Sequence, residues 1–278
     1  PMSIRTHNNP SSLSAQRLLG RTSKSLQGNL TKLTSGLRIN SAADDAAGLA
    51  VSSEMKVDMR SLNQAKRNAN DAISVLQTAE SAMGQQGDIL TRMRELSVQA
   101  NNATLNNSQR DALNQEFTQL QTEFDRIASN TTFNGTSLLD GTIAAGSGLD
   151  IQIGVESGDT VTVEVEDTTA ATLGVDSGTI DLSSTGNPAA AMTAIDSALE
   201  TVNAERAKVG AMQNRMDVAI ENLSSTYENT AAAHGRIVDV DVASEMASFT
   251  KNQVLMQAGS SMLAQANSQP QMALGLLG

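Results

Sequence analysis

The stretch that decides the fold reads SLNQAKRNANDAISVLQTAESAMGQQGDILTRMRELSVQA, residues 61–100. Mostly apolar residues recur in it every seven positions. One row holds Leu62, Ala69, Leu76, Met83 and Leu90, and a second row, offset by three, holds Ala65, Ala72, Ala79, Gln86, Met93 and Ala100. A seven-residue repeat keeps one seam of a helix facing a partner helix along its whole length. The pattern therefore predicts a long helix packed against another helix.

A matching repeat near the other end of the chain supplies that partner. One row holds Met192, Leu199, Arg206, Gln213, Ile220 and Tyr227, and the other holds Ile195, Val202, Val209, Met216 and Leu223. We therefore expect a mainly α fold, a long antiparallel coiled-coil-like bundle in which the N- and C-terminal helices are paired. An ordinary intramolecular bundle is enough to explain these rows.

Signals for helix starts divide the N-terminal half. Ser41 with Asp44 three residues later is typical of a capping box, and the long helix should then run to about Ala100. Ser108 with Asp111 predicts the start of a second helix of the same bundle.

The C-terminal half carries similar signals. Asn187 followed by Pro188 predicts the start of a helix that continues toward Ala233 and ends or bends at Gly235. A last helix is expected from about residue 241 to residue 266.

The middle of the chain follows a different period. Apolar residues alternate with polar ones over 149–155 and again over 161–165, with a Ser-Gly-Asp turn at 157–159. Strict alternation on both sides of a short turn predicts a β-hairpin, at about 149–166, with one buried face.

Composition excludes several classes of function. The 278 residues carry a formal charge of −11 without a run of Lys and Arg, so a nucleic-acid groove is not expected. Cysteine is absent, which excludes disulfides and thiolate metal sites. Aromatic residues are 2% of the chain, which favours thin helix seams over a thick globular core.

Neither a membrane segment nor an enzyme is expected. No run reaches the roughly twenty apolar residues that span a bilayer, and the opening PMSIRTHNNPSS lacks the apolar core of a cleaved secretory signal. His7 and His234 form no HExxH pair, which excludes a zinc protease insertion, and no GxSxG, P-loop or GxGxxG string is present. We expect no catalytic residue, cofactor or metal.

Several local strings identify a family. They are SGLRINSAADDAAGLA at 35–50, RNANDAISVLQTAE at 67–80, FNGTSLLDG at 133–141, AMQNRMDVAIENL at 211–223 and QAGSSMLAQANSQPQMALGLLG at 257–278. In this order they closely resemble bacterial flagellin, over nearly the whole chain. The resemblance implies a structural subunit that self-assembles into the helical tube of the extracellular flagellar filament, a propeller for motility.

The resemblance also implies a domain layout. Residues 1–44 with 236–278 would form the inner-tube domain, and 45–176 with 187–235 the shaft domain. The short connector 177–186 would replace the variable outer domains of larger members. Its Ser177, Thr179, Ser183, Ser184 and Thr185 are candidates for O-linked glycans.

The partners implied are many copies of the same chain, an export chaperone, and the filament cap and junction proteins. Export would use a type III channel without a cleaved signal peptide. A hook–filament junction protein and a non-polymerising coiled-coil adaptor are the alternatives.

The terminal helices are the candidate polymerisation surfaces. Their apolar residues are Leu19, Leu26, Leu30, Leu33 and Leu37 at one end and Phe249, Leu255, Met262 and Leu263 at the other. Isolated helices are marginal in water and depend on packing of one face. We therefore expect both terminal segments to be poorly ordered in the monomer and to fold when subunits stack.

Two further surfaces are candidates for recognition by innate immune receptors of vertebrates. Arg92 and Leu96 match positions read by the flagellin-sensing Toll-like receptor, with Glu116 on the neighbouring helix. At spacing i, i+4, Arg92 should share a helix face with an exposed Leu96, and packing between protofilaments would use the same face. Leu274, Leu276 and Leu277 match C-terminal leucines seen by cytosolic sensors, although a sticky tail is the plainer account.

Clusters of carboxylates are the last candidates. They are Asp44 with Asp45, Asp239 with Asp241, and Glu164 with Glu166 and Asp167. None has the spacing of an EF-hand loop, so charge at a helix start or a solvated face is the expected role.

Overall fold

The computed structural model describes residues 9–183 and 186–275, and for 270–275 it describes the backbone alone. The elements are α1 (Pro10–Ser35), α2 (Ala46–Ala100), α3 (Asn107–Asn130), β1 (Thr132–Phe133), β2 (Thr136–Ser137), β3 (Leu149–Gln152), β4 (Thr160–Val163), α4 (Ala170–Leu173), α5 (Pro188–Val238) and α6 (Val242–Gly275). They divide into two compact units, one within 1–58 and 229–278 and the other within 59–228. The inner-tube and shaft limits implied by the resemblance stay predictions.

The heptad rows form the core of the 59–228 unit, as predicted. Every residue of both rows on α2 is buried, and so is the α5 row of Ile195, Val202, Val209, Met216 and Leu223. The other α5 row is half-buried and ends at Tyr227, which is 37% exposed.

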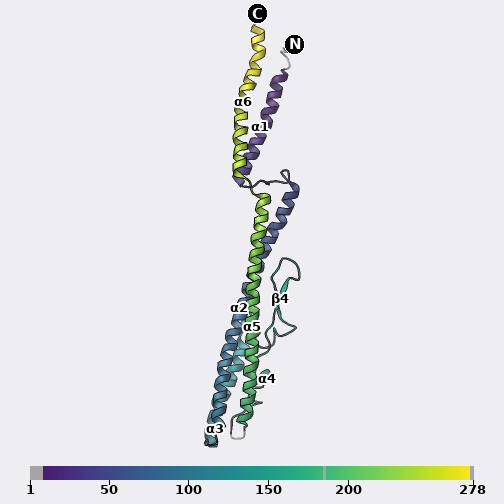
Figure 1. Ribbon diagram of the computed structural model, residues 1–278. Helices are drawn as coiled ribbons and strands as arrows, with labels where there is room; N and C mark the ends of the chain where they lie inside the picture. The colour runs from purple at the N-terminus through teal and green to yellow at the C-terminus, as the bar shows by residue number, and fades with distance from the viewer. Residues whose placement is uncertain (1–8, 184–185, 276–278) are drawn as a thin grey trace. The chain divides into compact units, whose positions relative to one another are not determined.

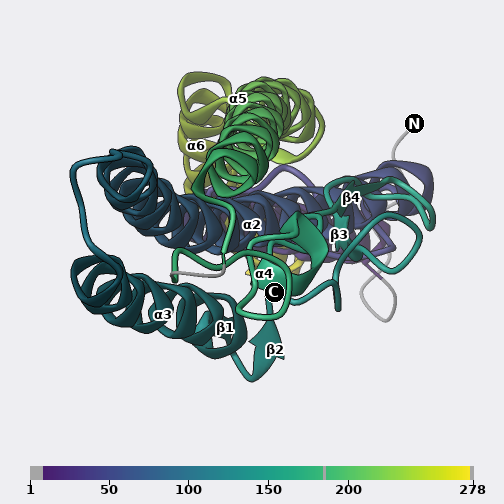
Figure 2. The ribbon, with the colours of Figure 1, turned by 90° about the horizontal axis from the view of Figure 1, so that it is seen from below.

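Polar contacts give the direction of the α2–α5 pair. Arg94 contacts Asp196 at 2.5 Å, and the Gln213 side-chain amide donates to Glu80 at 2.9 Å. Residue numbers rise along α2 from Glu80 to Arg94 while those of their partners on α5 fall from Gln213 to Asp196. The predicted antiparallel arrangement is therefore confirmed. Figure 2 shows α2 between α3 and α5.

The third helix packs with two aromatic residues. Phe117 and Phe124 are fully buried in the shared core, and Leu113 and Leu120 are packed against it. Helix α3 begins after Asn106 and not at Ser108 as predicted. Asn106 and Gln109 form a reciprocal capping box, with the Gln109 N–H donating to the Asn106 side chain.

The predicted β-hairpin is present in the middle of the chain. Strands β3 and β4 pair antiparallel, with Leu149 opposite Val163 and Ile151 opposite Val161. Val161 and Val163 are buried. Strand β3 ends at Gln152 and β4 at Val163. Val155, which was expected on the buried face, lies beyond the end of β3 and is 41% exposed.

Helix side chains bind the backbone of this irregular middle segment. Asn68 donates to the Gln152 carbonyl at 2.9 Å, and Gln86, which has no exposed surface, donates to the Thr168 carbonyl at 3.1 Å. Asn114 accepts the Leu182 N–H and Asp125 the Ala170 N–H, both at 2.9 Å. Buried backbone groups are costly when unpaired, so these side chains fix a segment that has few strand or helix bonds of its own.

The expected exposed connector is partly buried. Ser177 and Thr179 are exposed, but Ile180 and Leu182 lie in the core, where Leu182 has no exposed surface. Gln121 of α3 donates to the carbonyls of Val175 and Ile180 at 2.9 and 3.3 Å. Ser184 and Thr185 lie outside the described residues. The connector is therefore held against the helices, because the side chains of Ile180 and Leu182 pack into the core.

In the other unit, α1 and α6 pack side by side and antiparallel (Figure 1). Asn9 donates to the Ala266 carbonyl at 2.7 Å, and the Ser12 hydroxyl donates to the Asn267 side chain at 2.8 Å. At the opposite end Leu37 forms a β-bridge with Asp239. The predicted pairing of terminal helices is confirmed.

Three helix limits in this unit differ from prediction: the start of α2 and the ends of α5 and α6. Asp44 accepts the N–H and hydroxyl of Ser41, which closes a turn, and α2 starts only after Asp45, whose carboxylate accepts the Gly48 N–H at 2.9 Å. Asp45 therefore caps α2, and not Ser41.

At the C-terminal side, α5 begins after Asn187 as predicted, with the Ala190 N–H donating to the Asn187 side chain at 3.2 Å. It does not end at Gly235 but runs to Val238. Asp241 then caps α6 by accepting the N–H groups of Ala243 and Ser244, and α6 runs beyond the predicted residue 266 to Gly275.

Candidate assembly surfaces

Packing between α1 and α6 is thin. The buried residues of α1 are Ser12, Thr22 and Asn29, all polar. Leu19 lies against Gly259, where an added Cβ would approach its side chain to 3.2 Å. A pair that buries so little apolar surface gains little free energy from its own contact.

Large apolar side chains remain exposed on both helices. They are Leu13 (56%), Leu18 (62%), Leu30 (54%), Val242 (57%), Met246 (48%), Val254 (58%), Leu255 (46%) and Met262 (65%). Between the helices lies an open, mostly apolar groove of about 390 Å³, whose lining includes Leu18, Leu19, Leu255 and Met262. Contiguous apolar surface of this kind marks an interaction site.

The structure divides the predicted polymerisation residues into two groups. Leu30, Leu255 and Met262 are exposed, while Leu19, Leu26, Leu33, Leu37, Phe249 and Leu263 are half-buried. The sequence pattern did not predict Leu13 and Leu18 as polymerisation residues, because they lie outside the apolar stripe that runs from Leu19 to Leu37.

A cationic face on α1 was also missed. Arg17, Arg21 and Lys24 follow one another at i, i+4 and i+7, which places them on one side of the helix, and all three are exposed. Residues 1–43 contain six Lys and Arg and no Asp or Glu. Residues 127–205 contain twelve Asp and Glu and no Lys or Arg. Counting charge by segment would have found this separation.

Arg92 and Glu116 do meet on the surface of the other unit. Nε and Nη2 of Arg92 donate to Oε1 of Glu116 at 3.0 and 2.7 Å, and Nη1 contacts Glu95 at 2.9 Å. The hydrogen bonds that Arg92 donates to Glu116 and then to Glu95 raise the pKa of Arg92. Both ion pairs are solvated, so they contribute little to stability.

Leu96 does not join that surface. It is 1% exposed and lies in the core, so the expectation of an exposed Leu beside Arg92 is wrong. Positions 92 and 96 share a helix face, but that face points toward α3. The long Arg92 side chain reaches solvent at the edge of the contact, whereas the shorter Leu96 stays inside.

The acidic clusters near the helix starts have local partners. The Ser41 hydroxyl, with the N–H groups of Asn40 and Ser41, lowers the pKa of Asp44. Asp45 and Asp241 are helix caps. The expectation that these clusters serve helix starts is confirmed for those two residues.

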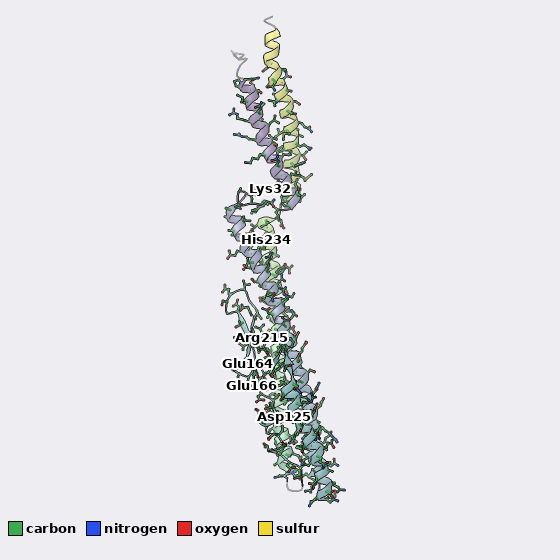
Figure 3. The ribbon with its side chains drawn as sticks, turned by 180° about the vertical axis from the view of Figure 1, so that it is seen from behind. Lys32, Asp125, Glu164, Glu166, Arg215 and His234 are labelled. Carbon is green, nitrogen blue, oxygen red and sulfur yellow. The ribbon has the colours of Figure 1, made fainter. Side chains whose placement is uncertain are left out.

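The third acidic cluster lies beside a cavity of about 350 Å³ lined by Glu164, Glu166, Glu205, Lys208 and Arg215, among others. Figure 3 labels Glu164, Glu166 and Arg215. Glu205 is 3% exposed; its carboxylate accepts the Glu166 N–H at 3.1 Å and contacts Lys208 at 2.9 Å. The contact with Glu205 raises the pKa of Lys208. Across the described ranges, no group of three or more His, Asp and Glu side chains is arranged to hold a metal ion.

Two remaining predictions concern the C-terminal tail and the membrane. Leu276 and Leu277 lie outside the described residues, and only the backbone of Leu274 is described. Within the part of the chain that the structure describes, no helix has the length and apolar content to cross a membrane.

Both halves of the chain match family models. The bacterial flagellin N-terminal helical region matches residues 7–144, and the bacterial flagellin C-terminal helical region matches residues 192–277. The chain belongs to the bacterial flagellin family. Only residues 145–191 separate the two matches, so this flagellin lacks the variable domain.

Relatives of similar length support the assignment. A flagellin from Halalkalibacterium halodurans is 43% identical over 99% of both chains. The flagellar filament 33 kDa core protein of Treponema phagedenis is 43% identical over 98% of this chain and 99% of its own. Flagellin from Bacillus subtilis is 40% identical over 99% of this chain and 100% of its own length.

Among solved structures, Bacillus cereus flagellin is 41% identical and covers 60% of this chain and 94% of its own, with a TM-score of 0.49. A flagellar hook-associated protein from Vibrio parahaemolyticus covers 70% of this chain and 100% of its own, with a TM-score of 0.59. At 15% identity, that second likeness concerns the fold alone.

Proposed function

We propose that this flagellin is the structural subunit of a bacterial flagellar filament, in which many copies self-assemble into a helical tube that works as a propeller. The function is mechanical, without catalysis. Family membership at both ends of the chain supports a filament subunit.

One structural observation, the exposed apolar surface of the terminal helices, supports the proposal of self-assembly. The terminal helices expose eight large apolar side chains, Leu18 and Met262 at more than 60%, while the 59–228 unit has a closed heptad core. Burying apolar surface is the main favourable term in protein association, at about 25 cal/mol per Å² removed from water. Contacts with α1 and α6 of other copies would cover these faces, which a single chain leaves in water.

Several finer features belong to the same proposal. Export would proceed unfolded through a type III channel to an extracellular filament, with help from a chaperone, and cap and junction proteins would bind the growing polymer. The tail with Leu274, Leu276 and Leu277 is proposed as a contact for cytosolic innate sensors. Arg92 with Glu116 is proposed as a contact for protofilament neighbours and for the Toll-like receptor.

Electron microscopy of the purified protein, seeded with short filament fragments, tests the proposal directly. We expect long tubes with a narrow central channel. Monomers that persist under seeding and precipitant salt would contradict the filament assignment and favour a non-polymerising adaptor.

A matched pair of variants tests which surface drives assembly. Val254→Gln removes an exposed valine of α6, and Val218→Gln removes a similarly exposed one of α5, at 58% and 66% exposure. We expect the critical concentration for assembly to rise with Val254→Gln and to stay near wild type with Val218→Gln. Circular dichroism should show unchanged helix content in both. Equal effects of the two changes would contradict the assignment to the terminal helices.

A further inference from the structure

The turn between β1 and β2 has an unusual backbone. Asn134 and Gly135 connect two strands that pair Thr132 with Ser137 and Phe133 with Thr136. Asn134 has φ 49°, alone among the described non-glycine residues in having a positive φ, and Gly135 has φ 81°. Two successive left-handed residues form a tight hairpin turn, which Asn-Gly adopts with little strain.

This turn is also open to solvent. Asn134 and Gly135 are both exposed, and a Cβ added at Gly135 would meet no atom within 4 Å. Water therefore reaches the carboxamide of Asn134 and the backbone nitrogen that follows it. Asn134-Gly135 is the one Asn-Gly pair in the sequence.

We propose that Asn134 is a site of spontaneous deamidation. The backbone nitrogen of Gly135 attacks Cγ of Asn134; the new N–Cγ bond closes a five-membered succinimide, and the Cγ–Nδ2 bond breaks. Nδ2 leaves as ammonia with the proton that Gly135 loses. Water then opens the ring at one of its two carbonyl carbons. Opening at Cγ gives aspartate, and opening at the main-chain carbonyl gives isoaspartate.

The other described asparagines lack one requirement of this reaction or another. A side chain on the following residue hinders the attack, and Gly135 has none. Pro188 follows Asn187, and its nitrogen carries no proton to lose. Asn106 holds the Gln109 N–H at 2.9 Å through its side-chain oxygen, and Asn29 is buried in α1. Asparagines inside helices are followed by backbone N–H groups that already donate within the helix.

The folded conformation of the turn limits the rate of deamidation at Asn134. Ring closure requires Asn134 to leave its left-handed conformation, so the turn must first open. The ladder holds only two residue pairs, and two-stranded hairpins are marginal by themselves. Leu138 and Leu139 follow directly and are fully buried, so the opening can stay confined to the turn. We expect the folded chain to react more slowly than the unfolded chain, and still first at Asn134.

The product differs in charge and in backbone length. Either product adds one negative charge to a chain of net charge −11. Isoaspartate also carries the main chain through an extra methylene, which the two-residue turn has no room for. Modified chains should therefore lose the pairing of Phe133 with Thr136.

Peptide mass spectrometry of the full-length folded protein, incubated at 37 °C in mildly alkaline buffer, tests the proposal. The peptide with residue 134 should gain the mass difference between a carboxyl and a carboxamide and should become a substrate for isoaspartyl methyltransferase. This should precede any change in the peptides with Asn106 and Asn187. Chemically unfolded protein gives the upper limit of the rate.

The Asn134→Gln variant is the matched control, because it keeps an amide but would need a larger ring. Its isoaspartyl signal at 134 should be lost, with circular dichroism to check folding. An unmodified residue 134 after other asparagines have reacted would overturn the proposal, with no variant needed. Signal that persists in Asn134→Gln, or reaction only in the unfolded chain, would overturn it as well.

Discussion

Single buried side-chain amides on the helices bind backbone carbonyls of the middle segment. Substitution of Gln121 is the sharpest test of their role. It is 4% exposed and donates to two carbonyls, those of Val175 and Ile180. Gln121→Leu would leave both buried carbonyls unpaired, which should lower the free energy of unfolding by about 1–3 kcal/mol. Urea titration measures the change. Gln119→Leu, at an exposed position of the same helix, should cost less than about 0.5 kcal/mol. Equal midpoints for the two variants would contradict the role given to Gln121.

Carboxylates in the same segment should make stability depend on pH. The Thr179 hydroxyl and the Gly178 N–H lower the pKa of Asp176, and Thr142 lowers that of Asp140. These groups bind fewer protons when folded, so their stabilisation is present above their ordinary pKa of about 4 and is lost as pH falls through the folded value. The melting temperature should hold down to about pH 5 and drop below about pH 4. Asp176→Asn should show a shallower drop, and an identical acid profile would contradict the assignment.

At the scale of residues, the sequence predicts burial along a repeat better than it predicts partners. Gln86 stands in a heptad row and is buried as that row requires. Its bond to the Thr168 carbonyl could not be predicted, because the partner lies 82 residues away in a segment without a period. The prediction that Leu96 is exposed was wrong for a related reason. Spacing shows that two residues share a helix face, but it does not show which neighbouring element covers that face.

At the scale of elements, substitution of two glycines tests whether α1 is only marginally stable as a helix. Gly28 lies inside α1 with open space around a Cβ position, whereas Gly36 ends α1 at φ 72°. Gly28→Ala should stabilise the helix by about 0.5–1 kcal/mol, since glycine loses more backbone entropy on folding. Gly36→Ala should destabilise it by about 1 kcal/mol or more, because alanine disfavours a left-handed backbone.

Hydrogen exchange of α1 amides in the monomer measures both changes. It also tests the expectation that the terminal helices are poorly ordered before assembly. Protection should rise with Gly28→Ala and fall with Gly36→Ala. Strong protection of α1 already in the wild-type monomer would contradict that expectation, and the same sign for both variants would contradict the assignment of Gly36 as the helix end.

The long helices and the alternating β3–β4 hairpin were predictable, and the two-residue strands were not. A heptad repeat specifies a helix over many turns, so α2 and α5 followed from pattern alone. Helix starts were displaced by a few residues, as at Asp45 and Asn106, because several adjacent Asp, Asn and Ser side chains can each accept the same backbone N–H. The β1–β2 hairpin was missed even though Asn134-Gly135 is a turn signal, since two-residue strands show no alternation.

For the whole molecule, charge should decide how readily copies associate. Each copy carries a net charge of −11, so copies repel one another at low salt. The Debye length is about 8 Å at physiological ionic strength and about 30 Å at 0.01 M, so added salt should shorten this repulsion and lower the critical concentration for assembly. The cations of α1 work in the opposite direction, because they offset the acidic surface of neighbouring copies.

Sedimentation of seeded protein across a salt series measures the effect. Arg21→Gln and Arg60→Gln remove the same charge from exposed positions, the first on α1 and the second on α2. If α1 lies at the contact between copies, Arg21→Gln should raise the critical concentration at low salt more than Arg60→Gln does. The two variants should converge at high salt, where exposed charges are screened. A critical concentration that rises with salt would instead mean that attraction between opposite charges dominates the contact, with the apolar faces of α1 and α6 secondary.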